Sequence, residues 1–242
     1  MRISADTRYW LMRIGSVAGI IGSILAGVGN GLHPVTPRDD PVGVAQVIAD
    51  SGAWTLVHMV ILFGTLLMLG GLVAIRVSIE GGRAEALARF GLYAGVLGTT
   101  VGLITFVLDG VAAKELADTW AATPEAGKEI ALGLVTVNET INFALAGLFN
   151  LSFAGVPFTL LGLAVAGSNV FPRWWGWVAA VAGLGSIGAG LFQGFTGKPT
   201  IASLILTIIG PTVIVIWLLV MGILVGRLAT ATRAPEVVAG NK

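Results

Sequence analysis

The chain alternates between long charge-poor stretches and short segments that hold nearly all of its charged residues. A helix needs about 20 apolar residues to cross about 30 Å of hydrocarbon. Six stretches are long enough, which predicts an all-α polytopic membrane bundle of six transmembrane helices in a single integral membrane domain, residues 1–242. The expected spans are 12–32, 54–76, 90–111, 146–167, 174–194 and 203–226.

The composition supports this fold class and excludes others. The 242 residues are 55% hydrophobic and 11% charged, with a mean hydropathy of +0.90, far from the averages of soluble domains. The formal net charge of +1 leaves no basic face, so we expect no nucleic acid as a partner. The chain has no cysteine, so a metal would need histidine and carboxylate ligands. The stretch 14–32 is longer than the apolar core of a secretory signal and should be the first span.

The distribution of Lys and Arg predicts the orientation, because these residues gather in cytoplasmic loops. We therefore expect both termini in the cytoplasm and a multi-pass protein of the cell inner (plasma) membrane, with the lipid bilayer as its partner. The outer side would carry Arg38, Lys114, Lys128 and Lys198 together with most of the acidic loop residues. The cytoplasmic side would carry Arg2, Arg8, Arg13, Arg76, Arg83, Arg89, Arg173, Arg227, Arg233 and Lys242.

Polar side chains recur at one depth, near the outer edge of the expected bilayer. Counting outward from the inner arginines reaches His33, the neighbourhood of His58, and Asp109. Side chains in lipid find no hydrogen-bond partner, so such residues should turn inward and form a polar pocket that opens to the outer leaflet. The candidate ligand-binding residues of this pocket are Asn30, His33, Asn142, Asn150 and Gln193.

The sequence leaves the surroundings of the ionisable residues open. Asp109 is expected in the last turn of its helix, where it needs a partner: a protonated His33 or His58, Lys114, a bound cation, or its own proton. His58 should lie early in a helix capped by Asp50 or Ser51. His33 precedes Pro34 beyond the first span, and its ring points either back toward the bundle or out into water.

Three kinds of chemistry fit these residues. His33, His58 and Asp109 could bind zinc or another divalent ion, with one position open for water. The two histidines could instead ligate haem. Without a metal, His58, Asp109 and Glu139 are candidate catalytic residues for acid–base chemistry on a lipid-soluble substrate. The sequence requires no cofactor, and its identity, if one is bound, is unknown.

Glycine, proline and capping residues predict the local geometry. Gly91, Gly95, Gly98 and Gly102, with Gly190 and Gly194, should allow helices to pack closely within the bundle, and oligomerisation through such glycine-rich faces stays open. Asp40 and Pro41 should cap and begin a short helix, 41–50, over the pocket. Thr123 and Pro124 should cap and begin the fourth long helix, which Pro157 should kink.

Four short motifs carry a resemblance: LHP at 32–34, WTLVHMV at 54–60, VLDGVA at 107–112 and FPRWWGW at 171–177. With these the chain resembles a group of uncharacterised actinobacterial membrane proteins of the domain-of-unknown-function 4386 type. The resemblance implies a six-helix protein of the bacterial inner membrane, and it brings no known catalytic residues.

Three functions are therefore compatible with the sequence. The leading hypothesis is a membrane protein that binds a small or lipidic ligand, or a partner helix, in the outward-facing polar pocket. The first alternative is a membrane-embedded enzyme that uses His, Asp and Glu for acid–base or metal chemistry. The second alternative is a structural subunit of a membrane complex, which predicts that the polar residues do not converge.

Overall fold

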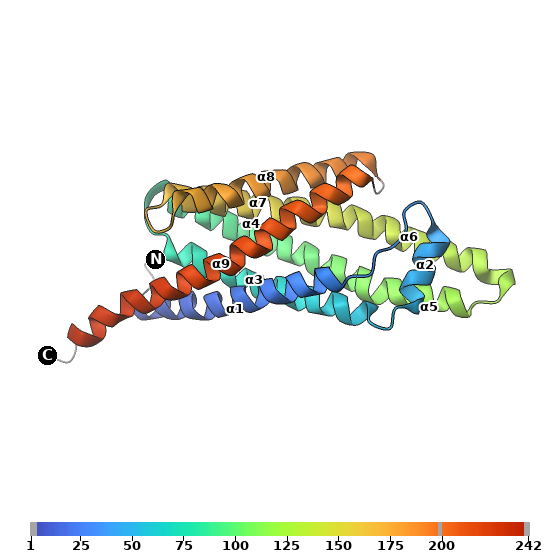
Figure 1. The fold of residues 1–242 in the computed structure, drawn as a ribbon, viewed down its shortest axis with the longest axis horizontal. Helices are drawn as coiled ribbons and strands as arrows, with labels where there is room; N and C mark the ends of the chain where they lie inside the picture. Colours follow the sequence, from blue (N-terminus) through green and yellow to red (C-terminus); the bar gives the residue numbers. More distant parts are fainter. Residues whose placement is uncertain (1–3, 198–199, 240–242) are drawn as a thin grey trace.

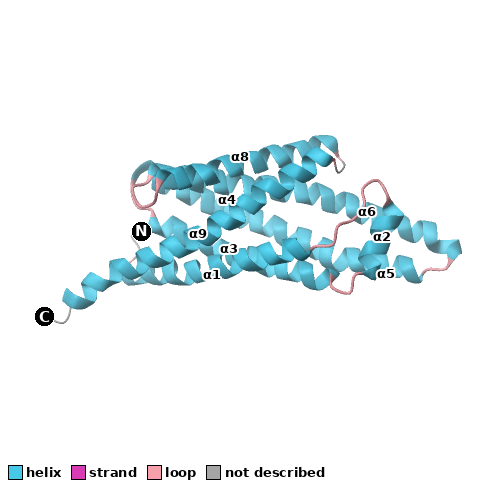
Figure 2. Ribbon diagram, viewed as in Figure 1, coloured by secondary structure: helices cyan, strands magenta, loops and turns pink. Residues whose placement is uncertain are grey.

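The computed structural model describes residues 4–197 and 200–239, and these residues form helices and connecting loops without a strand (Figure 2). Two segments, η1 and η2, are π-helical and continue the helices before them. The elements in order are α1 Ala5–Leu32, α2 Pro41–Asp50, α3 Trp54–Ser78, α4 Gly82–Val107, η1 Leu108–Ala112, α5 Ala113–Ala122, α6 Glu125–Phe149, η2 Asn150–Gly155, α7 Val156–Gly167, α8 Arg173–Thr196 and α9 Ile201–Ala239.

Six helical stretches of the described chain are long and apolar enough to cross a membrane, which confirms the predicted fold class. The third and fourth extend well past the predicted spans, because α4 runs on through η1 into α5 and α6 begins far outside the apolar region. The first and last described helices, α1 and α9, have their outer ends at the same end of the bundle, as an even number of crossings requires (Figure 1). The six stretches are Ala5–Leu32, Trp54–Ser78, Gly82–Ala122, Glu125–Gly167, Arg173–Thr196 and Ile205–Thr232.

Helices α1 and α3 pack against each other along most of their length, with glycines at the contact (Figure 1). A Cβ added to Gly22 would lie 2.6 Å from the carbonyl oxygen of Gly64, and one added to Gly15 would lie 2.4 Å from that of Gly70. Backbones this close leave no room for larger residues. The contact fixes α1 against α3 and brings the residue after α1, His33, next to the first turns of α3.

The predicted glycine contacts on α4 are internal. Gly91 packs on Leu161 of α7, Gly98 packs on the backbone of η2, and Gly102 packs on Phe149 of α6. Gly190 of α8 likewise lies against α6 and η2, whereas Gly194 has open space beside it. The close helix packing predicted from these spacings thus occurs within the chain at four of the five glycines named here.

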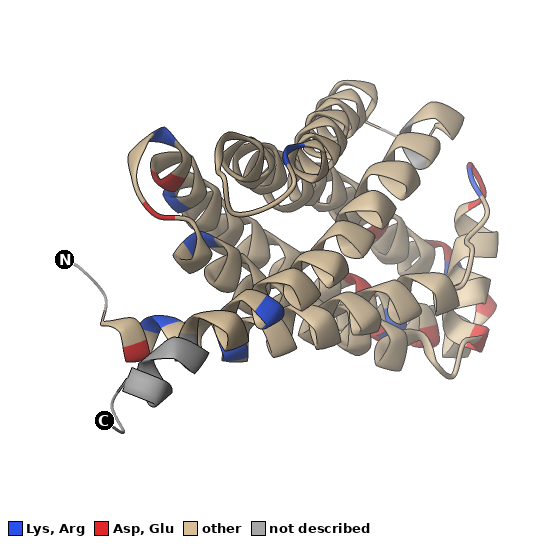
Figure 3. Ribbon diagram, turned by 60° about the vertical axis from the view of Figure 1, so that its left-hand side comes forward, with Lys and Arg blue, Asp and Glu red and all other residues tan. Residues whose placement is uncertain are grey.

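The two ends of the bundle differ in the charged residues that they carry (Figure 3). We call the end that holds Arg8, Glu80 and Glu85 the terminal end, because the described chain ends lie there (Figure 1). We call the opposite end, where His33 and Asp109 lie, the histidine end. Most of the Asp and Glu residues drawn in Figure 3 gather toward the histidine end, whereas Lys and Arg residues are frequent at the terminal end.

The helix of Asp109 does not end where the sequence predicted. It continues through η1 and α5 to Ala122, so Asp109 lies in the middle of a helix and the argument from a helix C-terminus was wrong. A Gly after a polar residue ends a helix when it adopts a left-handed conformation. Gly110 is not among the described glycines with a positive φ, and it keeps the helical conformation. Among the long described helices, only α8 ends at a left-handed glycine, Gly197.

The predicted helix starts were confirmed in part. Asp40 caps α2 with a 2.9 Å hydrogen bond from the Gly43 N–H, and Pro41 is the first residue of that helix. Asp50 and Ser51 do not cap α3; they end α2, and Ala53 precedes α3 without a side-chain cap.

The predicted start of the fourth long helix needs correction. Thr123 ends α5, and Pro124 is the cap of α6 and not its first residue. A π-helical segment, η2, precedes Pro157 and shifts the hydrogen-bond pattern there, and the kink at Pro157 stays a prediction.

Candidate functional site

His33, His58 and Asp109 converge at the histidine end of the bundle. The Nε2 atom of His33 lies 3.1 Å from Nε2 of His58, and His58 Nε2 lies 3.1 Å from Oδ2 of Asp109. One ligand atom from each of the three residues lies within 4.8 Å of the others. The ring of His33 therefore turns back toward the bundle, which answers the question that the sequence left open.

Backbone carbonyls fix the tautomer of both histidines. His33 Nδ1 lies 2.8 Å from the carbonyl oxygen of Pro34, and His58 Nδ1 lies 2.8 Å from that of Trp54. A carbonyl oxygen only accepts hydrogen bonds, so each Nδ1 carries a proton. In a neutral ring the Nε2 atom then presents a lone pair. Two imidazole lone pairs and a carboxylate oxygen consequently face one another, and a positive charge is required among them.

Trp54 encloses both histidine rings. Its ring centroid lies 5.1 Å from that of His33 and 4.8 Å from that of His58, and the residue is only 2% exposed. Trp54 was not predicted as a site residue, although its place four residues before His58 puts it on the same helix face. It limits the movement of the two rings and shields them from water.

Burial favours the neutral form of His33. It lies just beyond α1, and loss of solvent together with the neighbouring His58 ring lowers the pKa of the His33 imidazole below its usual value of 6.5, although Asp109 and the Pro34 carbonyl act in the opposite direction. A neutral ring with its proton on Nδ1 offers Nε2 as an electron-pair donor.

The π-helical segment η1 positions Asp109. The indole N–H of Trp54 donates to the carbonyl oxygen of Asp109 at 2.6 Å, and the Thr55 hydroxyl donates to that of Gly110 at 2.8 Å. π-Helical turns leave carbonyls free for such bonds and occur often at functional sites. Gly110 is needed for the approach, because a Cβ there would lie 2.3 Å from Cβ of His58.

A cavity of about 210 Å³ extends from the three residues into the bundle. Its wall is polar at the histidine end and becomes aromatic and aliphatic farther in, where Phe106, Phe149 and Phe153 contribute. The other lining residues include Ala26, Asn30, Ile61, Thr65, Met68, Thr105, Ala146, Asn150, Ala154, Thr207, Pro211, Ile214 and Val215.

Of the other predicted ligand-binding residues, Asn30 and Asn150 line this cavity. The Asn30 amide donates to the carbonyl of Ala26, whereas Asn150 donates to Gln193 at 2.7 Å and to Thr207 at 3.2 Å. Gln193 is thus brought to the site indirectly, as the partner of Asn150. Thr207 was missed by the sequence analysis, because a threonine in an apolar stretch of α9 carries no distinctive pattern.

Glu139 and Asn142 face inward on α6 beside this region. The charges of Asp109 and His58 act on the Glu139 carboxyl group, which places the three groups near one another. The Oε1 atom of Glu139 and both polar atoms of Asn142 are buried without a hydrogen-bond partner of good geometry among the described residues. These groups do not line the cavity, but they form a second polar cluster on its α6 side.

Two expected partners lie elsewhere. Lys114 bonds the carbonyl oxygen of Ala49 and pairs with Asp118, and among the described residues Asp109 forms its ion pair with His58 instead. Helix α2 packs on α5 and α6, and it does not contribute to the cavity wall. It covers the outside of the histidine end rather than the pocket itself.

Comparison with known proteins gives a family. A family model described as Domain of unknown function (DUF4386) matches residues 10–222, a range that contains all of the candidate site residues. The chain belongs to this family. The DUF4386 match confirms the resemblance seen in the sequence motifs, and it carries no functional residues with it. No curated protein and no solved structure matches the chain.

Proposed function

We propose that this DUF4386 protein binds a small amphipathic molecule, or one end of a lipid, in the cavity that begins at His33, His58 and Asp109. The proposal rests on one observation: the polar cluster lines the same cavity, of about 210 Å³, as several aromatic side chains inside the membrane bundle. At about 30 Å³ for each water, this is roughly seven water volumes. Pockets for drug-sized ligands measure about 300–1,000 Å³, so the ligand here is smaller, or only its end enters.

The polarity of the wall supports a ligand with a polar head and an apolar body. Ionisable groups within membrane bundles are costly and generally mark functional sites. A polar head would lie at the two histidines and Asp109, and its apolar part would contact Phe106 and Phe149. The structural-subunit hypothesis predicted separated polar residues, and the convergence of three of them within 4.8 Å speaks against it.

The proposal places the protein in the inner membrane with its termini in the cytoplasm and the cavity toward the outer leaflet. The excess of Lys and Arg at the terminal end supports this orientation. The chain lacks cysteine, so single cysteines report orientation directly. In intact cells a membrane-impermeant maleimide should label Gly52→Cys but not Gly167→Cys, both positions having open space around them. The reverse pattern would refute this orientation.

A matched pair of alanines on α6 tests ligand binding. Ala146 lines the cavity, whereas Ala144 on the same helix is exposed. The wild-type protein is purified in mild detergent, and bound molecules are extracted and identified by mass spectrometry. We expect one species that Ala146→Leu reduces at least tenfold and that Ala144→Leu leaves unchanged. Absence of any bound species in the wild type, or equal amounts in both variants, would refute the proposal.

Glu139 supports a second candidate, a membrane-embedded enzyme. Its Oε1 atom is enclosed near Asp109 and His58 without a hydrogen-bond partner of good geometry among the described residues, so this oxygen is available for proton transfer to or from a bound molecule. In this case the bound species would be converted by the wild type, and Glu139→Gln would retain it without conversion. Glu129→Gln, at an exposed position of α6, is the control. Equal conversion by both variants would remove Glu139 from the chemistry.

A further inference from the structure

We propose that His33, His58 and Asp109 together bind one divalent transition-metal ion. This inference goes beyond ligand binding in the cavity, because it depends on the three side chains alone and not on what occupies the rest of the space. The metal would take the place of the proton between His58 and Asp109 and would also contact His33.

Three electron-pair donor atoms converge at the histidine end. Since Nδ1 of each histidine donates to a carbonyl, the Nε2 atoms of His33 and His58 and the Oδ2 atom of Asp109 all offer electron pairs to one another. A single proton is shared by two such atoms, whereas here three converge within 4.8 Å. Lys114, the basic side chain closest in sequence to Asp109, is bonded to Ala49 and Asp118. A metal cation accepts from all three donors at once.

Two of the three donor spacings suit a metal, and the ligand atoms of His33 and Asp109, within 4.8 Å of each other, must approach for one ion to contact both. Nitrogen and oxygen ligands lie about 2.0–2.2 Å from zinc, so two ligands of a tetrahedral site lie about 3.3 Å from each other. Both measured contacts of His58 Nε2, to His33 and to Asp109, are 3.1 Å.

The surroundings also match those of metal ligands. A histidine that binds a metal generally donates its other ring N–H to a carboxylate or to a backbone carbonyl, which fixes the ring. Both histidines do this, toward Pro34 and Trp54, at 2.8 Å each. Asp109 is held by the bonds of Trp54 and Thr55 to the η1 backbone. The two histidine rings and the backbone of Asp109 are therefore positioned before a metal arrives.

The donor set defines the class of ion. Two imidazoles and one carboxylate suit Zn²⁺, Fe²⁺ and related first-row ions, whereas Ca²⁺ and Mg²⁺ prefer sites made wholly of oxygen. Three protein ligands leave at least one coordination position open. This open position would face the cavity, since all three residues line it.

The experiment measures metal binding by the intact protein in detergent. After treatment with a chelator, the wild type is equilibrated with Zn²⁺, and bound zinc is quantified by mass spectrometry. Co²⁺ in a parallel sample reports the ligand field through its visible absorption. We expect one zinc per chain and a cobalt spectrum typical of nitrogen and oxygen ligands. His58→Ala and Asp109→Asn should each lower the affinity at least about 100-fold.

Asp118→Asn is the matched control, because it removes a carboxylate of the same continuous helix that pairs with Lys114. It should bind zinc as the wild type does. Circular dichroism and gel filtration show whether each variant is folded, and a misfolded Asp109→Asn is replaced by Asp109→Glu, which should keep binding but shift the cobalt spectrum. A wild type that binds no zinc or cobalt, or folded ligand variants that bind as tightly as the wild type, would overturn the proposal.

Failure of the metal site and failure of the cavity ligand can be told apart. If only the metal proposal is wrong, Ala146→Leu still removes the bound molecule and zinc does not bind. If only the cavity proposal is wrong, zinc binds with unit stoichiometry and no molecule is lost from Ala146→Leu.

Discussion

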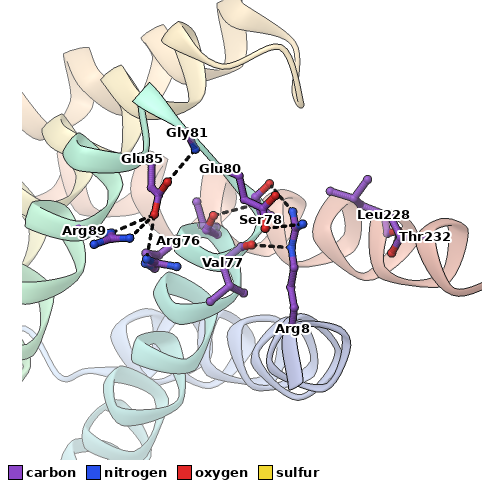
Figure 4. Close-up of polar contacts among 11 residues, drawn as sticks. Arg8, Arg76, Val77, Ser78, Glu80, Gly81, Glu85, Arg89, Leu228 and Thr232 are labelled. Atoms are coloured by element: carbon purple, nitrogen blue, oxygen red, sulfur yellow. Dashed lines mark hydrogen bonds and ion pairs between the residues drawn. The ribbon is translucent and has the colours of Figure 1, made fainter. Parts of the chain in front are cut away.

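The charged groups at the two ends of the bundle are paired in different ways. At the terminal end, Arg8 pairs with Glu80 at 2.6 Å and donates to the carbonyl of Val77, and Glu85 lies between Arg76 and Arg89 (Figure 4). Each charge named here has an opposite charge beside it. At the histidine end, Oδ2 of Asp109 lies 3.1 Å from Nε2 of His58, which lies 3.1 Å from Nε2 of His33. The terminal end is built from pairs of permanently charged groups, whereas the balance of charge at the histidine end depends on a proton or a bound cation among these three side chains.

This difference separates a structural contact from a binding site. The terminal network ties the start of α1 to the end of α3 and the start of α4, and its partners all come from the chain. The histidine cluster is held just as firmly, by Trp54, Thr55 and Pro34, yet its side chains point their lone pairs at one another. A bound cation would stabilise such a rigid set of electron-pair donors.

Addition of zinc should produce the largest difference between the two ends. A ligand at 100 times its dissociation constant raises the free energy of unfolding by about 2.7 kcal/mol. We expect this stabilisation in the wild type and in Glu85→Gln, and we expect none in Asp109→Asn. Thermal unfolding in detergent, with and without zinc, measures it. Equal stabilisation of all three proteins would show that zinc binds outside the histidine end.

Substitution at Gly110 should have the next largest effect. A Cβ at this position would lie 2.3 Å from Cβ of His58, so Gly110→Ala should push η1 from α3, lower the free energy of unfolding by about 1–3 kcal/mol and weaken zinc binding. Gly133→Ala on α6, where a Cβ meets nothing within 4 Å, should be neutral or slightly stabilising. Denaturant unfolding compares the two variants. If Gly110→Ala is as stable as Gly133→Ala, the close contact is not required.

Loss of a charge at the terminal end should cost less. Glu85→Gln removes the pairs with Arg76 and Arg89 on a partly exposed surface, where such pairs contribute at most about 1 kcal/mol. The deficit should shrink in 1 M salt, because salt screens exposed charges. Unfolding at low and high salt tests this. A loss that is independent of salt would mean that Glu85 acts mainly through its hydrogen bond to the Gly81 N–H.

The smallest effect should come from Asp118→Asn, in the helix that also carries Asp109. Its pair with Lys114 spans one helical turn, and such pairs contribute about 0.3–0.5 kcal/mol. The variant should unfold within this margin of the wild type and retain zinc. A larger loss of stability, or a loss of zinc, would show that other acidic residues at this end, and not Asp109 alone, contribute to stability or to zinc binding.

Much of the fold was predictable because the bilayer imposes it. Six apolar stretches, the cap at Asp40 and the inward face of Asn142 and Asn150 follow from helix length, capping and helical periodicity, which are local properties. The common depth of His58 and Asp109 was predictable in the same way, since each helical residue advances about 1.5 Å from an arginine near the other surface. The predicted end of the Asp109 helix failed because a π-helical turn depends on bonds from Trp54 and Thr55, which belong to another helix.

The sequence by itself therefore determined that the chain is a six-helix membrane protein and which ionisable residues share one level. Only the tertiary structure decided that His33 turns inward, that Trp54 encloses the rings, and that both histidines donate through Nδ1. The physical reason is that depth along a helix is set by counting residues. The rotation of neighbouring helices and the path of the loop at Pro34 are set by contacts between distant parts of the chain, above all the glycine-lined packing of α1 on α3.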